Sequence, residues 1–178
     1  KSVKPISRIG CLPENPPALK NAIEAIKEAD LIVLGPGSLY TSLLPNLLVP
    51  EIVEELLKNN SPKIYISNLM TQPGETDGLD VYQHIKSIEK QLFNFGVNTR
   101  IFNAILSQGE FEGSSLIDYY RSRGAEPVIC NKKRLVSEGY HVLQAPLYSK
   151  RITPTLRHDY RRLARAVMYL YKKIKKAN

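Results

Sequence analysis

Short apolar runs alternate with stretches of helical periodicity along most of the chain. The apolar runs predict strands over 31–34, 63–67, 100–106, 128–130 and 141–144. Between them, apolar residues recur at three- and four-residue steps, which predicts helices over 17–29, from Pro50 to the Asn59-Asn60 pair, over 80–95, 114–123 and 131–138, and after Thr155. Because helices and apolar strands alternate almost one for one, the sequence predicts an α/β fold, a mainly parallel sheet with helices on both faces.

Four of the predicted helices have an apolar stripe. In the helix over 17–29 it is Ala18, Ala22, Ile23 and Ile26. In the helix that starts at Pro50 the stripe is Ile52, Val53, Leu56 and Leu57. In the helix over 80–95, with Asp80 as the expected N-cap, it is Val81, Ile85, Ile88 and Leu92. In the terminal helix it is Leu163, Ala166, Val167, Leu170 and Ile174.

Composition narrows the class of protein. The chain has 178 residues and 43% hydrophobic residues, with no internal repeat and no Gly/Ser linker, which predicts one domain over 1–178. No apolar run approaches the roughly 18 residues that a membrane helix needs, and no secretory signal is evident. Cys11 and Cys130 lie far apart, so we expect reduced thiols in the cytoplasm, and the three scattered histidines predict no metal site.

The excess of basic residues lies at one end of the sequence. Eight of the 25 Lys and Arg residues, but one of the 17 Asp and Glu residues, lie between Arg157 and Asn178. The rest of the chain is therefore close to neutral. A packed helix with a solvated basic face explains this pattern. We see no interleaving of aromatic and basic residues of the RNA-binding kind, so binding to nucleic acid is the less favoured interpretation.

In parallel sheets ligands bind beyond the carboxyl ends of the strands, so the loops that follow strands are the candidate sites. The first is 35–42, where Gly35 and Gly37 let a ligand approach the backbone and hydroxyls follow. Loop shape alone, or binding of an anion or substrate, explains the glycines. The loop is neither a P-loop, since it lacks the Lys, nor a dinucleotide fingerprint. Its polar side chains are Ser38, Tyr40, Thr41 and Ser42.

The second loop, 68–78, follows the next strand and contains amides, threonines and carboxylates. Asn68 and Gln72 are candidate hydrogen-bonding readers of a ligand. Glu75 or Asp77 could bind sugar hydroxyls or a metal-bound water, although their spacing is not that of an EF-hand. An ordinary polar loop explains the same residues.

The third segment is Arg157-His158-Asp159, which opens the terminal helix. Arg157 could hold a phosphate with two hydrogen bonds, and His158 could donate to one or act as an acid or base. Helix capping explains the same residues. No Ser-His-Asp or Cys-His set can be assembled from the sequence.

Together these segments resemble a known family. The strings are DLIVLGPGSLYTSLLPNLLVPEI over 30–52, ISNLMTQPGETDG over 66–78 and LRHD over 156–159. The first two are long and specific, and they resemble the gluconeogenesis factor family of the YvcK type. These proteins are bacterial relatives of CofD, the 2-phospho-L-lactate transferase that makes the deazaflavin cofactor. The similarity covers about Ala18 to Val167.

The resemblance implies a Rossmann-like α/β domain in a cytoplasmic regulator. Such a protein binds a nucleotide sugar, such as UDP-N-acetylglucosamine or UDP-glucose, and supports cell shape and wall synthesis during growth on gluconeogenic carbon sources. It implies no established reaction and no firm cofactor. By position, the pocket residues that carry over are Gly35, Gly37, Ser38, Tyr40, Thr41, Asn68, Thr71, Gln72 and His158. Ser42 and Arg157 complete the predicted binding set.

Two other functions remain open at this stage. A transferase of the CofD type would move a phospholactyl group from a guanosine diphosphate donor to a deazaflavin. It would use magnesium, with His158 or Glu75 in proton transfer. A basic interaction module would bind nucleic acid through the terminal helix. The amino-acid sequences of the first two motifs resemble the gluconeogenesis factors more than the transferases, which favours a regulator over an enzyme.

One departure from the family affects the expected domain organisation. Family members are longer and begin with a GGGTG-like nucleotide loop and a DDGGSSGRLR-like segment, and neither string occurs here. We therefore expect 1–178 to be the C-terminal portion of a longer chain, without the half that holds much of the nucleotide phosphate site. A sheet edge left exposed in this way would favour a homo-oligomer.

Overall fold

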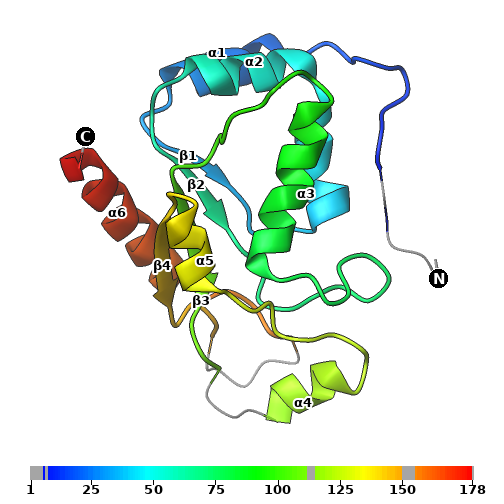
Figure 1. Cartoon of the computed structure of the whole chain (residues 1–178), viewed down its shortest axis with the longest axis vertical. Helices are drawn as coiled ribbons and strands as arrows, with labels where there is room; N and C mark the ends of the chain where they lie inside the picture. The colour runs from blue at the N-terminus through cyan, green and yellow to red at the C-terminus, as the bar shows by residue number, and fades with distance from the viewer. Residues whose placement is uncertain (1–5, 7, 112–114, 150–154, 178) are drawn as a thin grey trace.

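Four parallel strands form one sheet in the order β1-β2-β3-β4 (Figure 1). The computed structural model describes residue 6 and residues 8–111, 115–149 and 155–177. The register pairs Val33 with Ile64, Ile64 with Ala104, and Ala104 with His141. The predicted parallel α/β sheet is thus confirmed. Its strands are β1 Ile32–Leu34, β2 Lys63–Ile66, β3 Ala104–Gln108 and β4 His141–Ala145.

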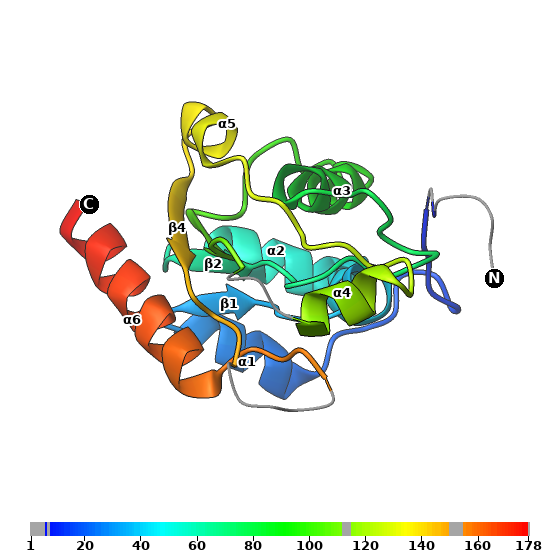
Figure 2. The same cartoon turned by 90° about the horizontal axis from the view of Figure 1, so that it is seen from below.

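Helices cover both faces of the sheet, as predicted. The helices α2 (Pro50–Lys58) and α3 (Val81–Phe93) pack on one face, and α6 (Tyr160–Ala177) packs on the other (Figure 2). Successive side chains of a strand point to opposite faces. In β2, Tyr65 accordingly joins the core under α2 and α3, whereas Ile64 joins the core under α6.

Shorter elements complete the connections. The helix α1 (Lys20–Glu28) packs on α2, where the Asn59 side-chain amide donates to the carbonyl of Ile26 at 2.7 Å. The helices α4 (Ser115–Arg121) and α5 (Lys132–Ser137) belong to the segment of the chain that connects β3 to β4. Ser114, the expected start of α4, lies outside the described residues. Two helical turns that the sequence did not predict, Leu39–Leu43 and Leu44–Leu48, fill the start of the β1–α2 connection with buried leucines.

The start of α3 has the predicted cap in full. Asp80 accepts a hydrogen bond from the Gln83 backbone N–H at 2.7 Å, and the Gln83 side chain accepts one from the Asp80 N–H at 2.8 Å. This reciprocal pair satisfies two N–H groups that a helix start otherwise leaves without partners. The predicted stripe of this helix is almost fully buried: Val81, Ile85, Ile88 and Leu92.

Three details of the sequence prediction are wrong. Residues 128–130 form a connection rather than a strand, because their backbone hydrogen bonds go to Leu69 and Val81 and not to a strand of the sheet. The strand β3 begins at Ala104 rather than at residue 100, since the Asn103 side chain already caps the Lys63 N–H that opens β2. In α2, Leu57 is 41% exposed, so the buried stripe is narrower than predicted.

The terminal helix α6 is amphipathic as predicted. Its buried side chains, Ala166, Leu170 and Ile174, pack on β3 and β4. Within the described residues, no helix combines the length and apolar character that crossing a membrane requires.

The capping box gives a stability prediction. Asp80→Ala should lower the free energy of unfolding by about 1 kcal/mol, because the N–H of Gln83 loses its acceptor. Urea unfolding measures this loss. The control is Glu54→Ala, whose exposed carboxylate pairs with Lys58 at 3.7 Å and should change stability by less than about 0.5 kcal/mol. Equal losses in the two variants would contradict the role of the cap.

Candidate functional site

The carboxyl ends of the strands meet at one edge of the sheet. Hydrogen bonding continues just past the strands, from the Ser67 N–H to the Leu106 carbonyl at 2.9 Å and from the Gly109 N–H to the Ala145 carbonyl at 3.0 Å. The loops that follow β1 and β2 therefore start side by side. The sequence placed both motif loops at this edge, and the structure confirms that position.

Backbone packing explains the two glycines of the first loop. Gly35 has a φ of +96°, and a Cβ at this position would lie 2.5 Å from the carbonyl oxygen of Ile66. A Cβ on Gly37 would lie 3.2 Å from the side chain of Leu43. Gly35 thus allows β1 to exit directly against β2, whereas a side chain at Gly37 would only crowd Leu43 and Ser42.

Two hydrogen bonds join the first loop to the second. The Gly37 N–H donates to Asn68 Oδ1 at 3.2 Å, and Ser38 Oγ donates to Glu75 Oε2 at 2.9 Å. Asn68, a predicted reader, and Ser38, a predicted pocket residue, are therefore held in place by contacts between the two loops. The Gly37 amide is already occupied in this arrangement, so it is not a free donor for an anion.

Several other predicted residues hold the second loop together. Thr71 is buried and exchanges two hydrogen bonds with the backbone of Glu126, at 2.7 and 2.9 Å. Asp77 is exposed and accepts from the Gly74 N–H at 2.6 Å, closing the turn. Gln72 donates its backbone N–H to Thr76, whereas its side-chain Oε1 is buried without a hydrogen-bonding partner in the described structure.

A short antiparallel pairing brings His158 to the same edge. Residues 147–149 pair with 157–159 through Ser149 N–H to Arg157 carbonyl at 3.0 Å and Asp159 N–H to Leu147 carbonyl at 2.7 Å. His158 hydrogen-bonds to the backbone of Ser67, next to Asn68. Its Nε2 is buried and has no hydrogen-bonding partner among the described residues.

The electrostatic state of His158 follows from its burial. Burial lowers the pKa of His158 below its ordinary value of 6.5, and the hydrogen bond to Ser67 offsets part of that shift. The ring is therefore neutral at pH 7. The hydrogen bond to Ser67 raises the pKa, so the ring N–H donates to the backbone carbonyl there, and Nε2 of the neutral ring is an acceptor.

We call the two linked pairs, together with the histidine that binds the backbone next to Asn68, the exit cluster: Gly37, Ser38, Asn68, Glu75 and His158. A residue on β3 that was not among the predicted site residues supports this cluster. Gln108 is buried, and its Oε1 accepts from the N–H groups of Leu147 at 2.7 Å and Tyr148 at 3.1 Å. This bond fixes the segment that pairs with His158. The signal was present, because Ser107-Gln108-Gly109 is a polar run after an apolar strand, like Ser67-Asn68 after β2.

Other predicted site residues lie outside the exit cluster. The Tyr40 hydroxyl points to the Ile6 carbonyl at 3.5 Å, and its ring lines a separate cleft of about 300 Å³ against α3. Thr41 and Ser42 are exposed on the turn after Ser38. The Arg157 side chain is exposed and donates to Thr155 at 3.1 Å. None of these contacts brings Arg157 to the exit cluster.

The residues at this edge do not fit a bound metal ion. In the described ranges, no three His, Cys, Asp or Glu side chains gather into a set that could hold a metal ion. Glu75 and Asp77, the carboxylates of the second loop, each already bind a neighbour. The exit cluster therefore offers a hydroxyl, an amide, a neutral imidazole and one carboxylate. Such groups suit a hydroxyl-rich ligand.

These observations define the class of protein: an α/β domain with a polar site at the carboxyl ends of its strands. The model of one family, described as 2-phospho-L-lactate transferase CofD, matches residues 1–148, so the chain belongs to the CofD family. It is 38% identical over 168 residues to the gluconeogenesis factor of Halalkalibacterium halodurans and 36% identical over 167 residues to that of Bacillus subtilis. The predicted resemblance is confirmed.

A solved structure supports the same assignment. The crystal structure of a member of the UPF0052 family from Bacillus halodurans has a TM-score of 0.84 and 37% sequence identity, and it covers 94% of this chain and 51% of its own. Each of the two matches to gluconeogenesis factors includes 94% of this chain, but only 50% and 51% of the respective relative. It thus spans about half their length, and 36% of a relative from Nostoc.

The close approach at Gly35 gives a second stability prediction. Gly35→Ala should cost more than about 2 kcal/mol, because it combines a positive φ with a clash against the Ile66 carbonyl. Thermal unfolding measures the loss. The control, Gly96→Ala, has a φ of +77° with open space around the added Cβ and should cost about 1 kcal/mol. If both variants lost the same stability, the clash would have no part in the effect.

The buried histidine gives a pH prediction. Since the pKa of His158 is lower in the folded than in the unfolded chain, the unfolded state takes up the proton first as the pH falls below about 6.5. Stability should then decrease from pH 7 toward pH 5, and His158→Gln should make that decrease smaller. Urea unfolding at each pH measures it. A midpoint of the His158 ring signal at or above 6.5 in an NMR titration would contradict the prediction.

Proposed function

We propose that this chain is part of a gluconeogenesis factor, a cytoplasmic regulator that binds a nucleotide sugar such as UDP-N-acetylglucosamine. In this proposal the regulator supports cell shape and wall synthesis on gluconeogenic carbon sources. The names of its relatives support the assignment to gluconeogenesis factors. The sugar end of the ligand binds at the exit cluster.

The composition of the exit cluster supports the proposal that the sugar end of the ligand binds there. A hydroxyl, an amide, a neutral imidazole with a free Nε2 and one carboxylate can exchange hydrogen bonds with sugar hydroxyls in both directions. The cluster contains no Lys or Arg, so it lacks the charge that a diphosphate needs. We therefore assign the diphosphate to another part of the protein.

A transferase of the CofD type is the second candidate, and the family match is what favours it. In that case Glu75 and His158 would be the groups at hand for proton transfer. Glu75 is engaged with Ser38 at 2.9 Å, and the lowered pKa of His158 keeps its ring unprotonated at neutral pH. Because the described residues do not fit a magnesium site, no step is assigned to a metal. Turnover of a phospholactyl donor with a deazaflavin acceptor would support this candidate.

Calorimetric titration with UDP-N-acetylglucosamine tests the proposal. Ser38→Ala and Asn68→Ala should each raise the Kd by about 5- to 30-fold, as expected for a lost ligand hydrogen bond of about 1–2 kcal/mol. The control is Thr99→Ala, an exposed residue that precedes β3 and so lies at the opposite end of the sheet. Unchanged affinity in both cluster variants would show that the sugar does not bind there.

A further inference from the structure

The helix α6 exposes a face that the exit cluster does not use. Its apolar side packs against β3 and β4 through Ala166, Leu170 and Ile174. Arg165, Lys172 and Lys176 are exposed. The helix lies along the outside of the molecule beside β4 (Figure 1). The packing on β3 and β4 therefore fixes the position of the solvent-exposed face of α6.

This face is basic, and Asp30 is the acid that acts on one of its lysines, Lys175. Between Tyr160 and Ala177 the helix has no Asp or Glu, and none of the ion pairs found in the described residues involves an α6 side chain. Since the chain before Arg157 is nearly neutral, the positive charge of the protein is concentrated here. The basic residues are Arg161, Arg162, Arg165, Lys172, Lys173, Lys175 and Lys176.

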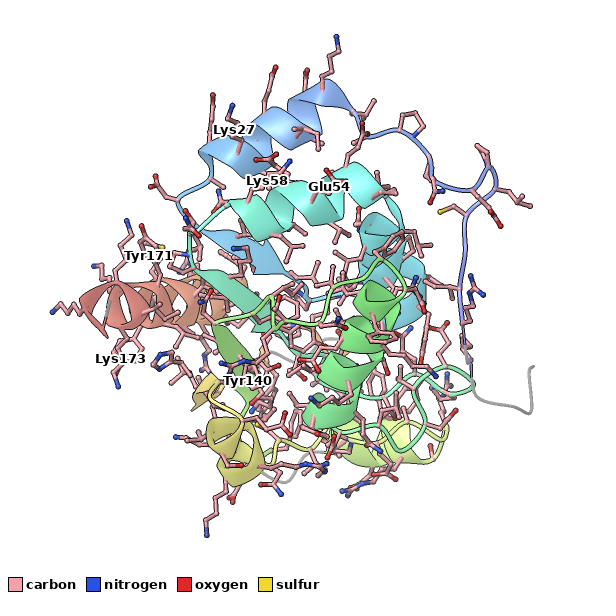
Figure 3. All side chains as sticks on the ribbon, turned by 45° about the horizontal axis from the view of Figure 1, so that its top comes forward. Lys27, Glu54, Lys58, Tyr140, Tyr171 and Lys173 are labelled. Atoms are coloured by element: carbon pink, nitrogen blue, oxygen red, sulfur yellow. The ribbon has the colours of Figure 1, made fainter. Side chains whose placement is uncertain are left out.

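Tyrosine rings lie among these cations. Tyr160 is 70% and Tyr169 is 51% exposed. The Lys173 Nζ lies 5.5 Å from the centre of the Tyr169 ring, and Lys175 Nζ lies 5.4 Å from that of Tyr171. In Figure 3 the side chains of Lys173 and Tyr171 leave α6 on different sides. In the folded helix these rings and cations therefore lie close together on the surface of α6.

We propose that this face of α6 binds single-stranded nucleic acid. Cations along a helix neutralise successive phosphates, and exposed aromatic rings stack on unpaired bases. The helix of 18 residues is about 27 Å long, enough to contact several nucleotides of an extended strand. Tyr169 is the expected stacking platform, and Arg165, Lys172 and Lys176 are the expected phosphate contacts.

The arrangement fits nucleic acid better than two other anionic partners. An interfacial membrane helix buries its apolar face in lipid, whereas the apolar face of α6 is already packed on the sheet. An acidic protein would use the cations but would have no particular need for the half-exposed ring of Tyr169. The ring is thus the feature that separates these partners experimentally.

Fluorescence anisotropy with labelled 12-nucleotide single-stranded RNA and DNA tests the proposal. The triple variant Arg165→Gln, Lys172→Gln, Lys176→Gln should weaken binding at least about tenfold. It should also reduce the slope of log K against log salt by about 2, or about 0.7 for each contact. The matched control is Lys20→Gln, Lys90→Gln, Lys133→Gln, which removes the same charge from exposed positions on α1, α3 and α5. It should bind nearly as the unchanged protein does.

The tyrosine is tested separately. Tyr169→Ala should weaken binding about tenfold, whereas Tyr169→Phe, which keeps the ring, should not. Circular dichroism checks that each variant is folded, and the affinity for UDP-N-acetylglucosamine should stay unchanged in all of them.

Three results would overturn the proposal. One is no binding of either oligonucleotide at 50 mM salt. Another is equal weakening by the two triple variants, which would mean that only net charge matters. The third is unchanged binding by Tyr169→Ala together with equal competition by polyglutamate, which would identify an acidic protein surface as the partner.

Discussion

The parallel pairing of β1 with β2 is the constraint on which the site depends. Leu34 pairs with Tyr65, so both strands end at the same level, and Gly35 passes directly against the Ile66 carbonyl. That approach brings Gly37 within reach of Asn68 and Ser38 within reach of Glu75. A residue with a side chain at Gly35 would push the two loops apart and separate the groups of the exit cluster.

The other side of the sheet has a different role. The pairing of β3 with β4 sets the position of the segment that Gln108 holds, and through it the position of His158. The chain then turns directly into α6, where Asp159 accepts from the N–H groups of Arg161 and Arg162. The segment 157–159 therefore contributes His158 to the exit cluster and leads directly into the helix that forms the basic face. The two surfaces use different residues, so each can be tested alone.

The sequence predicted those features that depend on local patterns. The stripe and cap of α3 and the place of both motif loops at the strand exits follow from periodicity and from short spacings. Features that depend on tertiary contacts could not be predicted. The role of Gln108 needed the true end of β3, and the separation of Tyr40 and Arg157 from the cluster needed the direction of their side chains. The predicted homo-oligomer and the predicted domain organisation stay predictions.

The central claim is that the exit cluster recognises the sugar of a nucleotide sugar. The most direct measurement is two-dimensional ¹H–¹⁵N NMR of the protein during titration with UDP-N-acetylglucosamine. The account predicts shifts in the backbone amides of Gly37, Ser38 and Glu75, the side-chain amide of Asn68 and the His158 ring, with α6 unaffected. Shifts confined to residues away from the strand exits, or none at saturating ligand, would contradict it.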